Sequence, residues 1–226
     1  MKHVRFIILA VLSVFCLNMS AQGIRIYKSD STVIDLDYAQ VDSIVAIQYI
    51  GYEDFVDMGL SVKWAKFNVG ATAPEEYGDY FAYAETYTKE EFTEINCMSY
   101  CKDFEYVSGD DNYDAARVVM GAPARIPTLE EIQELEDNTT SEWTTLNGVN
   151  GRLVTSKING NTIFFPAAGR KFGSTVEYAG EDGYYWSVTP FETLGYYGYY
   201  LGFYKDNFVH FWTYRYYGQS VRAVRN

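Results

Sequence analysis

The sequence RIPTLEE at residues 125–131 marks the start of a helix. Thr128 is placed to cap that helix, and Glu131 can return a hydrogen bond to the backbone N–H of Thr128, which is the reciprocal pattern of a capping box. The apolar residues that then recur at helical spacing are Leu129, Ile132 and Leu135. This spacing predicts an amphipathic helix with one face in a core and its acidic side chains in solvent.

Around this helix the sequence alternates between short apolar runs and polar turns. A second helix is predicted at 111–120, where Ala115, Val118 and Val119 could face a core. The runs that read as strands lie at 62–69, 80–84, 162–168, 196–204 and 208–214. Many short strands and about two helices predict an α+β domain built from antiparallel strands.

The composition limits the classes of protein to which the chain can belong. Of its 226 residues 48% are hydrophobic and 21% are charged, which is enough for a packed core. The formal net charge of −12 opposes contact with phosphate backbones, so nucleic acid is not an expected partner. His3 and His210 are the only histidines, which argues against a histidine-based metal site and histidine-dependent catalysis. We expect neither a metal nor a cofactor.

Residues 1–21 have the pattern of a secretory signal peptide. Lys2 and Arg5 supply a basic start, residues 6–17 are apolar, and small residues stand before a cleavage point at Gln22. The apolar run is shorter than the roughly 20 residues that cross a bilayer. The sequence therefore predicts an exported protein, secreted or held at the outer cell surface, without a transmembrane segment once the signal is removed.

The rest of the chain is expected to form a small N-terminal segment, 22–50, and a main domain, 51–226. The apolar runs of the small segment lie at 24–27, 33–36 and 44–49. Runs of this length separated by polar turns predict a β-hairpin followed by a strand.

Two local features of the main domain leave alternatives open. The oxygen-rich stretch 108–114 could hold Ca²⁺, or it could form a turn with an Asx cap that leads into the helix, and we favour the turn. Cys97 and Cys101 are close enough in sequence to form a local disulfide, or they stay as two thiols.

A series of short motifs follows in order along residues 51–226. They are VDMGLSVKWA (56–65), NVGA (68–71), GDYFA (78–82), ET (85–86), DAA (114–116), RIPT (125–128), NGVNG (147–151), FPAAG (165–169), YWS (185–187) and GQSVR (218–222). In this order they resemble the Fibrobacter succinogenes major paralogous domain, a family of secreted bacterial proteins. The resemblance implies a fold similar to the C-type lectin domain and to the formylglycine-generating enzyme superfamily.

That superfamily implies two different activities. One precedent is an oxidase with reactive thiols in the C-terminal part of its domain, and the other is a set of binding proteins that includes variable proteins of diversity-generating retroelements. The last cysteine here is Cys101, so we expect a binding protein and not an enzyme. A carbohydrate-active or sulfatase-modifying-like enzyme, and a structural subunit of a surface assembly, stay as alternatives. Whether the C-terminal segment is diversified is left open.

The C-terminal segment is the candidate site because it holds half of the 22 tyrosines, all after residue 177. Strand alternation puts Leu201 and Phe203 on a buried face and predicts that aromatic side chains share the opposite face. The residues expected to form one ligand-binding face are Tyr196, Tyr197, Tyr200, Tyr204, Asn207, His210, Trp212, Tyr214, Tyr216 and Tyr217. Tyrosine offers rigid contact area with a polar tip, so we expect this face to bind a protein or a glycan at a cell surface.

Overall fold

The structure is a computed structural model that describes residues 7–9, 18–20, 23–27, 33–37, 45–47, 51–102, 108–191 and 195–226. The chain divides into two compact units, Met1–Tyr49 and Ile50–Asn226. Among the residues described, no helix has both the length and the hydropathy needed to cross a membrane.

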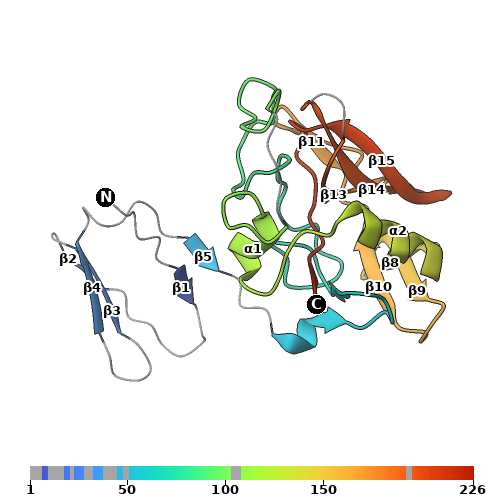
Figure 1. The fold of residues 1–226 in the computed structure, drawn as a ribbon, viewed down its shortest axis with the longest axis horizontal. Coiled ribbons are helices and arrows are strands. Elements are labelled where there is room, and N and C mark those ends of the chain that lie inside the picture. Colours follow the sequence, from blue (N-terminus) through green and yellow to red (C-terminus); the bar gives the residue numbers. More distant parts are fainter. Residues whose placement is uncertain are drawn as a thin grey trace. The chain divides into compact units, whose positions relative to one another are not determined.

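The described residues of the first unit form short strands (Figure 1). β2 (Asn18–Ser20), β3 (Gly23–Tyr27) and β4 (Val33–Asp37) form an antiparallel sheet, and β1 (Ile7–Leu9) pairs with β5 (Val45–Ile47) in parallel. The pairing of β3 with β4 is the hairpin that the apolar runs predict, and β5 lies within the third run. The segment that we expect to be a signal peptide contributes β1 and β2.

The described part of the second unit combines two α-helices with mostly antiparallel strands, which confirms the predicted α+β class. Its elements, in order, are the 3-10 helix η2 (Tyr52–Asp54), β6 (Phe55–Val56), β7 (Lys63–Ala65), α1 (Ala115–Met120), α2 (Leu129–Asn138), β8 (Thr139–Leu146), β9 (Val149–Ser156), β10 (Thr162–Pro166), β11 (Arg170–Phe172), β12 (Thr175–Glu177), β13 (Gly183–Pro190), β14 (Tyr197–Tyr204), β15 (Asn207–Tyr214) and β16 (Val224–Arg225). Their sheets have the strand orders β10-β9-β8, β11-β12, β13-β14-β15 and β16-β7-β6.

Both helices begin at a side-chain cap. The capping box of α2 is present, because Thr128 Oγ1 accepts from the Glu131 N–H at 3.3 Å and Glu131 Oε2 accepts from the Thr128 N–H at 2.9 Å. α1 begins at Ala115, later than predicted, because Asp114 accepts from the Arg117 N–H at 3.0 Å and so ends the preceding turn. The expected helix at 111–120 is therefore correct in kind but too long at its start.

The core lies on both faces of the sheet β13-β14-β15. α2 contacts all three of these strands and also β8, so it lies between two sheets (Figure 1). Ile132 and Leu135 of α2 are fully buried beside Leu201 and Phe203 of β14, as the periodicity predicts. Trp186 of β13 belongs to a separate core cluster. The sheet that carries the candidate site is thus held by packing on two sides.

A buried cation fixes the C-terminal end of the chain. Arg222 is fully buried and donates to Asn68 Oδ1 at 2.9 Å, to the Ala65 carbonyl at 2.9 Å and to the Phe164 carbonyl at 2.8 Å. Burial lowers the pKa of Arg222 to about 10, and each of its three nitrogens has one of these acceptors. The GQSVR motif therefore joins three distant segments of the second unit.

Candidate ligand-binding surface

The site is built on the hairpin of β14 and β15. Tyr204 pairs with Asn207, so the turn between the strands has only two residues. Arg152 of β9 is buried beneath the tip, and its Nη1 lies 2.9 Å from the Tyr204 carbonyl, 3.0 Å from that of Lys205 and 3.1 Å from that of Asn207. These bonds satisfy carbonyls at the turn and fix the hairpin to the neighbouring sheet.

The register of this hairpin decides which side chains share a face. On one face Tyr197 lies opposite Tyr214, Tyr199 opposite Trp212, and Leu201 opposite His210. On the other face Tyr200 lies opposite Phe211, and Tyr204 lies opposite Asn207. The predicted site residues of β14 and β15 are therefore divided between the two faces of the hairpin.

The expectation that Tyr200 and Tyr204 share a face with His210, Trp212 and Tyr214 is wrong. Alternation within each strand is as predicted, but the two-residue turn brings Tyr200 opposite Phe211 and not opposite a member of the expected set. A one-residue change of register exchanges the faces of a strand, and alternation alone does not fix register.

Five rings on the first face pack into one cluster, which we call the aromatic surface: Phe191, Tyr197, Tyr199, Trp212 and Tyr214. The ring centroid of Tyr197 lies 4.8 Å from that of Tyr214 and 5.0 Å from that of Trp212. Phe191 lies 5.1 Å from Trp212 and 5.4 Å from Tyr199. Trp212 is 52% exposed and Tyr214 is 36% exposed, so the cluster is open to a ligand.

Further tyrosines extend the aromatic surface at one border. Tyr216 stacks on Tyr214 at 5.1 Å and contacts Tyr217 at 4.9 Å. Tyr196 lies 6.2 Å from Tyr197, and Tyr100 contacts both Tyr196 at 5.2 Å and Tyr216 at 5.3 Å. The structure thus brings the predicted residues of the loops to the aromatic surface.

Sequence reasoning missed three members of this network, Phe191, Tyr199 and Tyr100. Tyr199 shares strand alternation with Tyr197, so the hairpin register would have identified it. Tyr100 lies far from β14 in sequence, and no local pattern links it to the site.

Three predicted residues on the opposite face, Tyr200, Tyr204 and Asn207, have other roles. Tyr200 packs against Tyr184 at 5.6 Å, Phe211 at 6.0 Å and Trp186 at 6.4 Å, and burial raises its pKa to about 12. It therefore supports the sheet. Tyr204 is exposed at the hairpin tip, where its hydroxyl accepts from Asn207 Nδ2 at 3.2 Å, apart from the aromatic surface.

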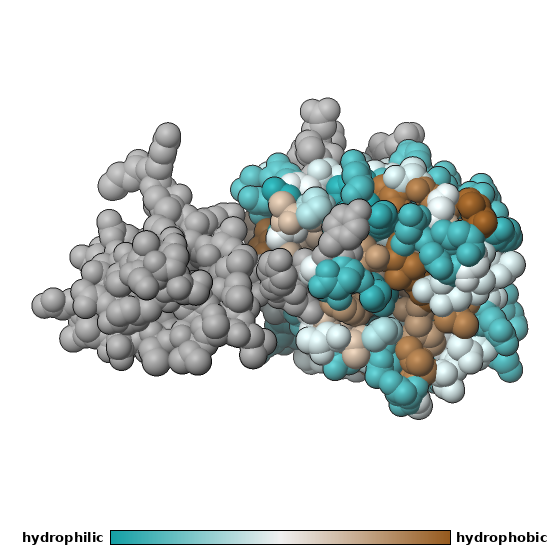
Figure 2. Space-filling view, turned by 90° about the horizontal axis from the view of Figure 1, so that it is seen from below, coloured by the Kyte–Doolittle hydropathy of each residue, from teal (hydrophilic) through white to brown (hydrophobic). Residues whose placement is uncertain are grey.

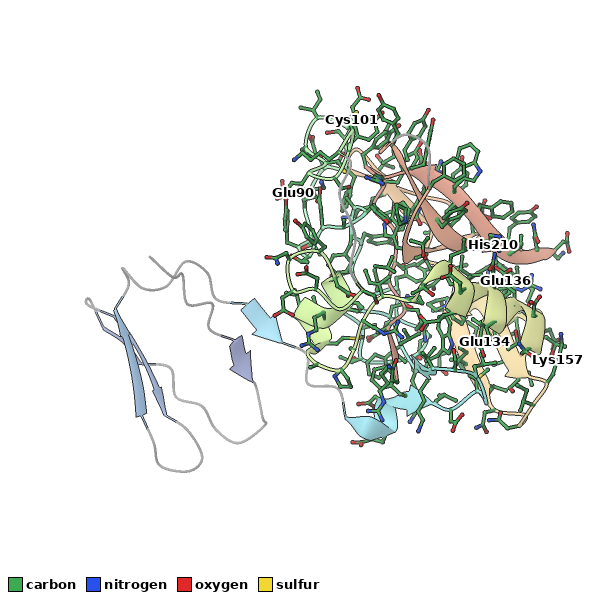
Figure 3. The ribbon with its side chains drawn as sticks, in the orientation of Figure 1. Glu90, Cys101, Glu134, Glu136, Lys157 and His210 are labelled. Carbon is green, nitrogen blue, oxygen red and sulfur yellow. The ribbon has the colours of Figure 1, made fainter. Side chains whose placement is uncertain are left out.

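His210 forms a polar border. Its Nδ1 lies 2.9 Å from Oε2 and 3.2 Å from Oε1 of Glu136 on α2, and the two side chains lie side by side in Figure 3. The Nε2 atoms of Gln133 and His210 are 3.5 Å apart, and the ring centroids of Tyr199 and His210 are 6.4 Å apart. Burial raises the pKa of Glu136, while the hydrogen bond from His210 opposes that shift. This pair connects β15 to α2.

A cation is already stacked at the other border. The Arg170 guanidinium lies 4.2 Å from the ring centroid of Tyr217, 5.3 Å from that of Tyr184 and 5.6 Å from that of Tyr178. Its Nε also forms an ion pair with Glu177 at 3.2 Å. The rings of this protein thus accept a guanidinium on their faces.

The structure places the carboxylates of 108–114 in turn and cap positions. Asp114 accepts from the N–H groups of Gly109 at 2.8 Å and Ile126 at 2.9 Å, and Asp110 Oδ1 accepts from Asn112 at 2.8 Å. Burial raises the pKa of Asp114, and its bonds from backbone N–H groups oppose that shift. Within the described part of the chain, no three His, Cys, Asp or Glu side chains gather as a metal site would require.

Cys97 and Cys101 are free thiols in the structure. Cys97 is buried, with its Sγ 3.5 Å from Ser99 Oγ, and burial raises the pKa of its thiol. Cys101 is exposed. The alternative of two thiols, which the sequence left open, is the one that the structure has.

A pocket of about 390 Å³ lies near the cysteines, and its lining includes Ser99 and Lys102, whose carbonyls accept from the same Arg215 that donates to the Tyr197 carbonyl. Glu85 and Met98 contribute to its lining. The Glu85 carboxylate accepts from the Met98 N–H at 2.7 Å and forms an ion pair with Lys89 at 2.7 Å. This carboxylate is thus bound to groups of the protein itself.

On the face of the second unit seen in Figure 2, hydrophilic and apolar side chains are intermixed.

The fold and the surface together define a class of protein: an α+β chain with an exposed, packed aromatic surface on a hairpin. Comparison with protein-family models, curated proteins and solved structures found no match for the chain. The geometry of the aromatic surface is therefore the basis for proposing a function.

Proposed function

We propose that the protein binds a ligand, a protein or a glycan, through its aromatic surface. The observation that carries the proposal is the exposure of Trp212 and Tyr214 within a continuous cluster of packed rings. Exposed apolar area of this kind is rare on monomeric proteins unless it is a contact site. Tyrosine and tryptophan add hydrogen-bonding groups to rigid contact area, and so they are frequent in recognition sites.

The rigidity of the scaffold supports this proposal. Arg152 fixes the hairpin tip, and Leu201 and Phe203 anchor β14 in the core. A surface that is already ordered loses less conformational entropy on binding than a flexible one. Hydrophobic burial with hydroxyl bonding, and no metal, is the proposed mechanism.

The proposal includes location and fold. We propose a C-type lectin-like domain of the secreted bacterial type, exported by residues 1–21 and placed outside the cell or on its outer surface. The order of the sequence motifs supports it, as does the mixed α+β arrangement with mostly antiparallel strands.

Binding is favoured over catalysis at this site. His210 and Glu136, the acid–base pair beside the aromatic surface, hydrogen-bond to each other and connect two elements. Such a pair is explained by its contribution to the fold. The proposal is accordingly that of a binding protein, with the enzyme as the alternative that an activity screen would have to support.

A binding screen tests the proposal. The purified chain is applied to an array of defined oligosaccharides and to a library of short displayed peptides, beside the variants Trp212→Ala and Tyr214→Ala. The matched control is Tyr87→Ala, since Tyr87 is 47% exposed and lines the pocket, outside the aromatic surface. We expect a ligand whose binding is lost in the first two variants and kept in the third. Equal binding by all three variants would place the site elsewhere.

A further inference from the structure

We infer that the partner is a protein segment that presents arginine or lysine side chains to the aromatic surface. The inference rests on the proposed function and narrows its ligand class. It is carried by two observations: the stacking geometry of the rings and the net negative charge of the second unit.

The rings offer faces that attract cations. The face of a tryptophan or tyrosine carries negative charge density, and tryptophan binds cations most strongly. Trp212 is half exposed and has Tyr197 and Phe191 as ring neighbours at 5.0 Å and 5.1 Å. An added guanidinium would therefore meet several ring faces at once.

The same network already holds a guanidinium. Arg170 stacks on Tyr217 at 4.2 Å, and Tyr217 lies 6.2 Å from Tyr214 of the aromatic surface. This internal contact shows that a tyrosine ring next to the aromatic surface binds a guanidinium on its face. Arg170 itself is paired with Glu177, so its charge is balanced within the protein.

The second unit as a whole carries a negative charge. The unit Ile50–Asn226 carries 14 Lys and Arg against 26 Asp and Glu, a formal charge of −12. Glu94 is exposed near Tyr100, whose pKa is raised to about 12, first by burial and then by the charge of Glu94. Glu136 lies at the opposite border, next to His210.

Positive groups below the surface are already engaged. Arg215 is buried and donates to the carbonyls of Tyr197 at 3.0 Å, Ser99 at 3.1 Å and Lys102 at 2.9 Å. A cationic partner complements the ring faces and the net negative charge of the second unit, whereas a neutral glycan would use the rings alone. Charge complementarity is what favours a basic protein segment.

The experiment measures binding of a fluorescent arginine-rich peptide to the full chain by anisotropy. Its matched control is the same peptide with citrulline, which is neutral and nearly the same shape, in place of arginine. The protein variants are Trp212→Leu and Tyr214→Leu, with Tyr87→Leu as the control, and circular dichroism checks that each is folded. A neutral oligosaccharide array is run in parallel.

We expect the arginine peptide to bind and the citrulline peptide to bind at least about tenfold more weakly. We expect Trp212→Leu and Tyr214→Leu each to weaken binding by about tenfold, and Tyr87→Leu to stay within about twofold of the parent. Raising the salt concentration should weaken binding of the arginine peptide without abolishing the difference between variants.

Other outcomes overturn the inference. Equal binding of both peptides, or arginine binding that is unchanged in both ring variants, removes the role of cation stacking. Oligosaccharide binding that depends on Trp212, with no peptide binding, overturns the inference but keeps the proposed function. A dimer that Trp212→Leu converts to monomers would make a second copy the occupant. No binding of any probe to a folded protein counts against both proposals.

Discussion

Tyr197 and Tyr214 lie directly opposite each other on β14 and β15, with ring centroids 4.8 Å apart. This one pair fixes the rest of the register, because each step along the hairpin alternates between its two faces. Trp212 then lies opposite Tyr199 within the aromatic surface, while Tyr200 lies opposite Phe211 on the other face of the hairpin. Chemically similar side chains thus have different roles according to register alone.

The first prediction separates these two faces. Tyr200→Ala should lower the free energy of unfolding by about 2–3 kcal/mol, because it removes a ring that packs against the buried Trp186 and against Tyr184. Trp212→Ala, at a half-exposed position, should cost no more than about 1 kcal/mol and act on ligand binding. Urea unfolding of both variants measures the difference. Equal losses of stability would mean that Trp212 belongs to the core.

The second prediction concerns the start of α2. Thr128→Ala removes the acceptor of the Glu131 N–H and should lower the free energy of unfolding by about 1 kcal/mol. Thr128→Ser keeps an acceptor oxygen at the same position and should retain most of that stability. Thermal or urea unfolding of the pair checks the result, and a Ser variant as unstable as the Ala variant would assign the effect to packing of the methyl group.

The third prediction concerns alkaline pH. Burial raises the pKa of Tyr185 and of Tyr200 to about 12, against about 10 for a free tyrosine. Since these pKa values are raised in the folded state, the stability they contribute is complete below pH about 10 and is lost as the pH rises through about 12. The protein should therefore unfold in this window.

Tyrosinate absorbance and circular dichroism, recorded on one sample through this pH range, test that prediction together. The late-ionising tyrosines should appear in the same step as the loss of folded signal. Ionisation of every tyrosine near pH 10, with the fold intact, would contradict the burial of Tyr185 and Tyr200.

How far the sequence predicted the structure depended on the range of the interactions involved. The capping box at Thr128 and the burial of Ile132 and Leu135 could be predicted because they rest on contacts within one helix. The start of the other helix differs from the prediction because Asp114 is its N-cap, where it accepts from the Arg117 N–H and also from the N–H groups of Gly109 and Ile126, and helical periodicity does not reveal these bonds.

The candidate site was predicted in part for the same reason. Alternation correctly placed Leu201 and Phe203 in the core. The pairing of β14 with β15 depends on the turn length, so Tyr199 was missed and Tyr200 was assigned to the wrong face. Tyr100 joins the surface through a contact across the second unit, which a single sequence does not display.

The last prediction joins the hairpin tip to the aromatic surface. Arg152 is buried and its Nη1 contacts three carbonyls at the turn, so Arg152→Met should remove these bonds and lower the free energy of unfolding by about 3 kcal/mol. The matched control is Lys157→Met, since the exposed Lys157 donates to a single carbonyl, that of Asp137, and its loss should cost about 0.5 kcal/mol or less. Arg152 lies beneath the hairpin tip and is not part of the aromatic surface. If the folded Arg152→Met variant binds ligand more weakly, the cause is therefore a change in the order of the hairpin. Binding measured beside amide hydrogen exchange of β14 and β15 distinguishes the cases: faster exchange with weaker binding supports a preordered surface, and unchanged exchange in both strands contradicts the role of Arg152 in fixing it.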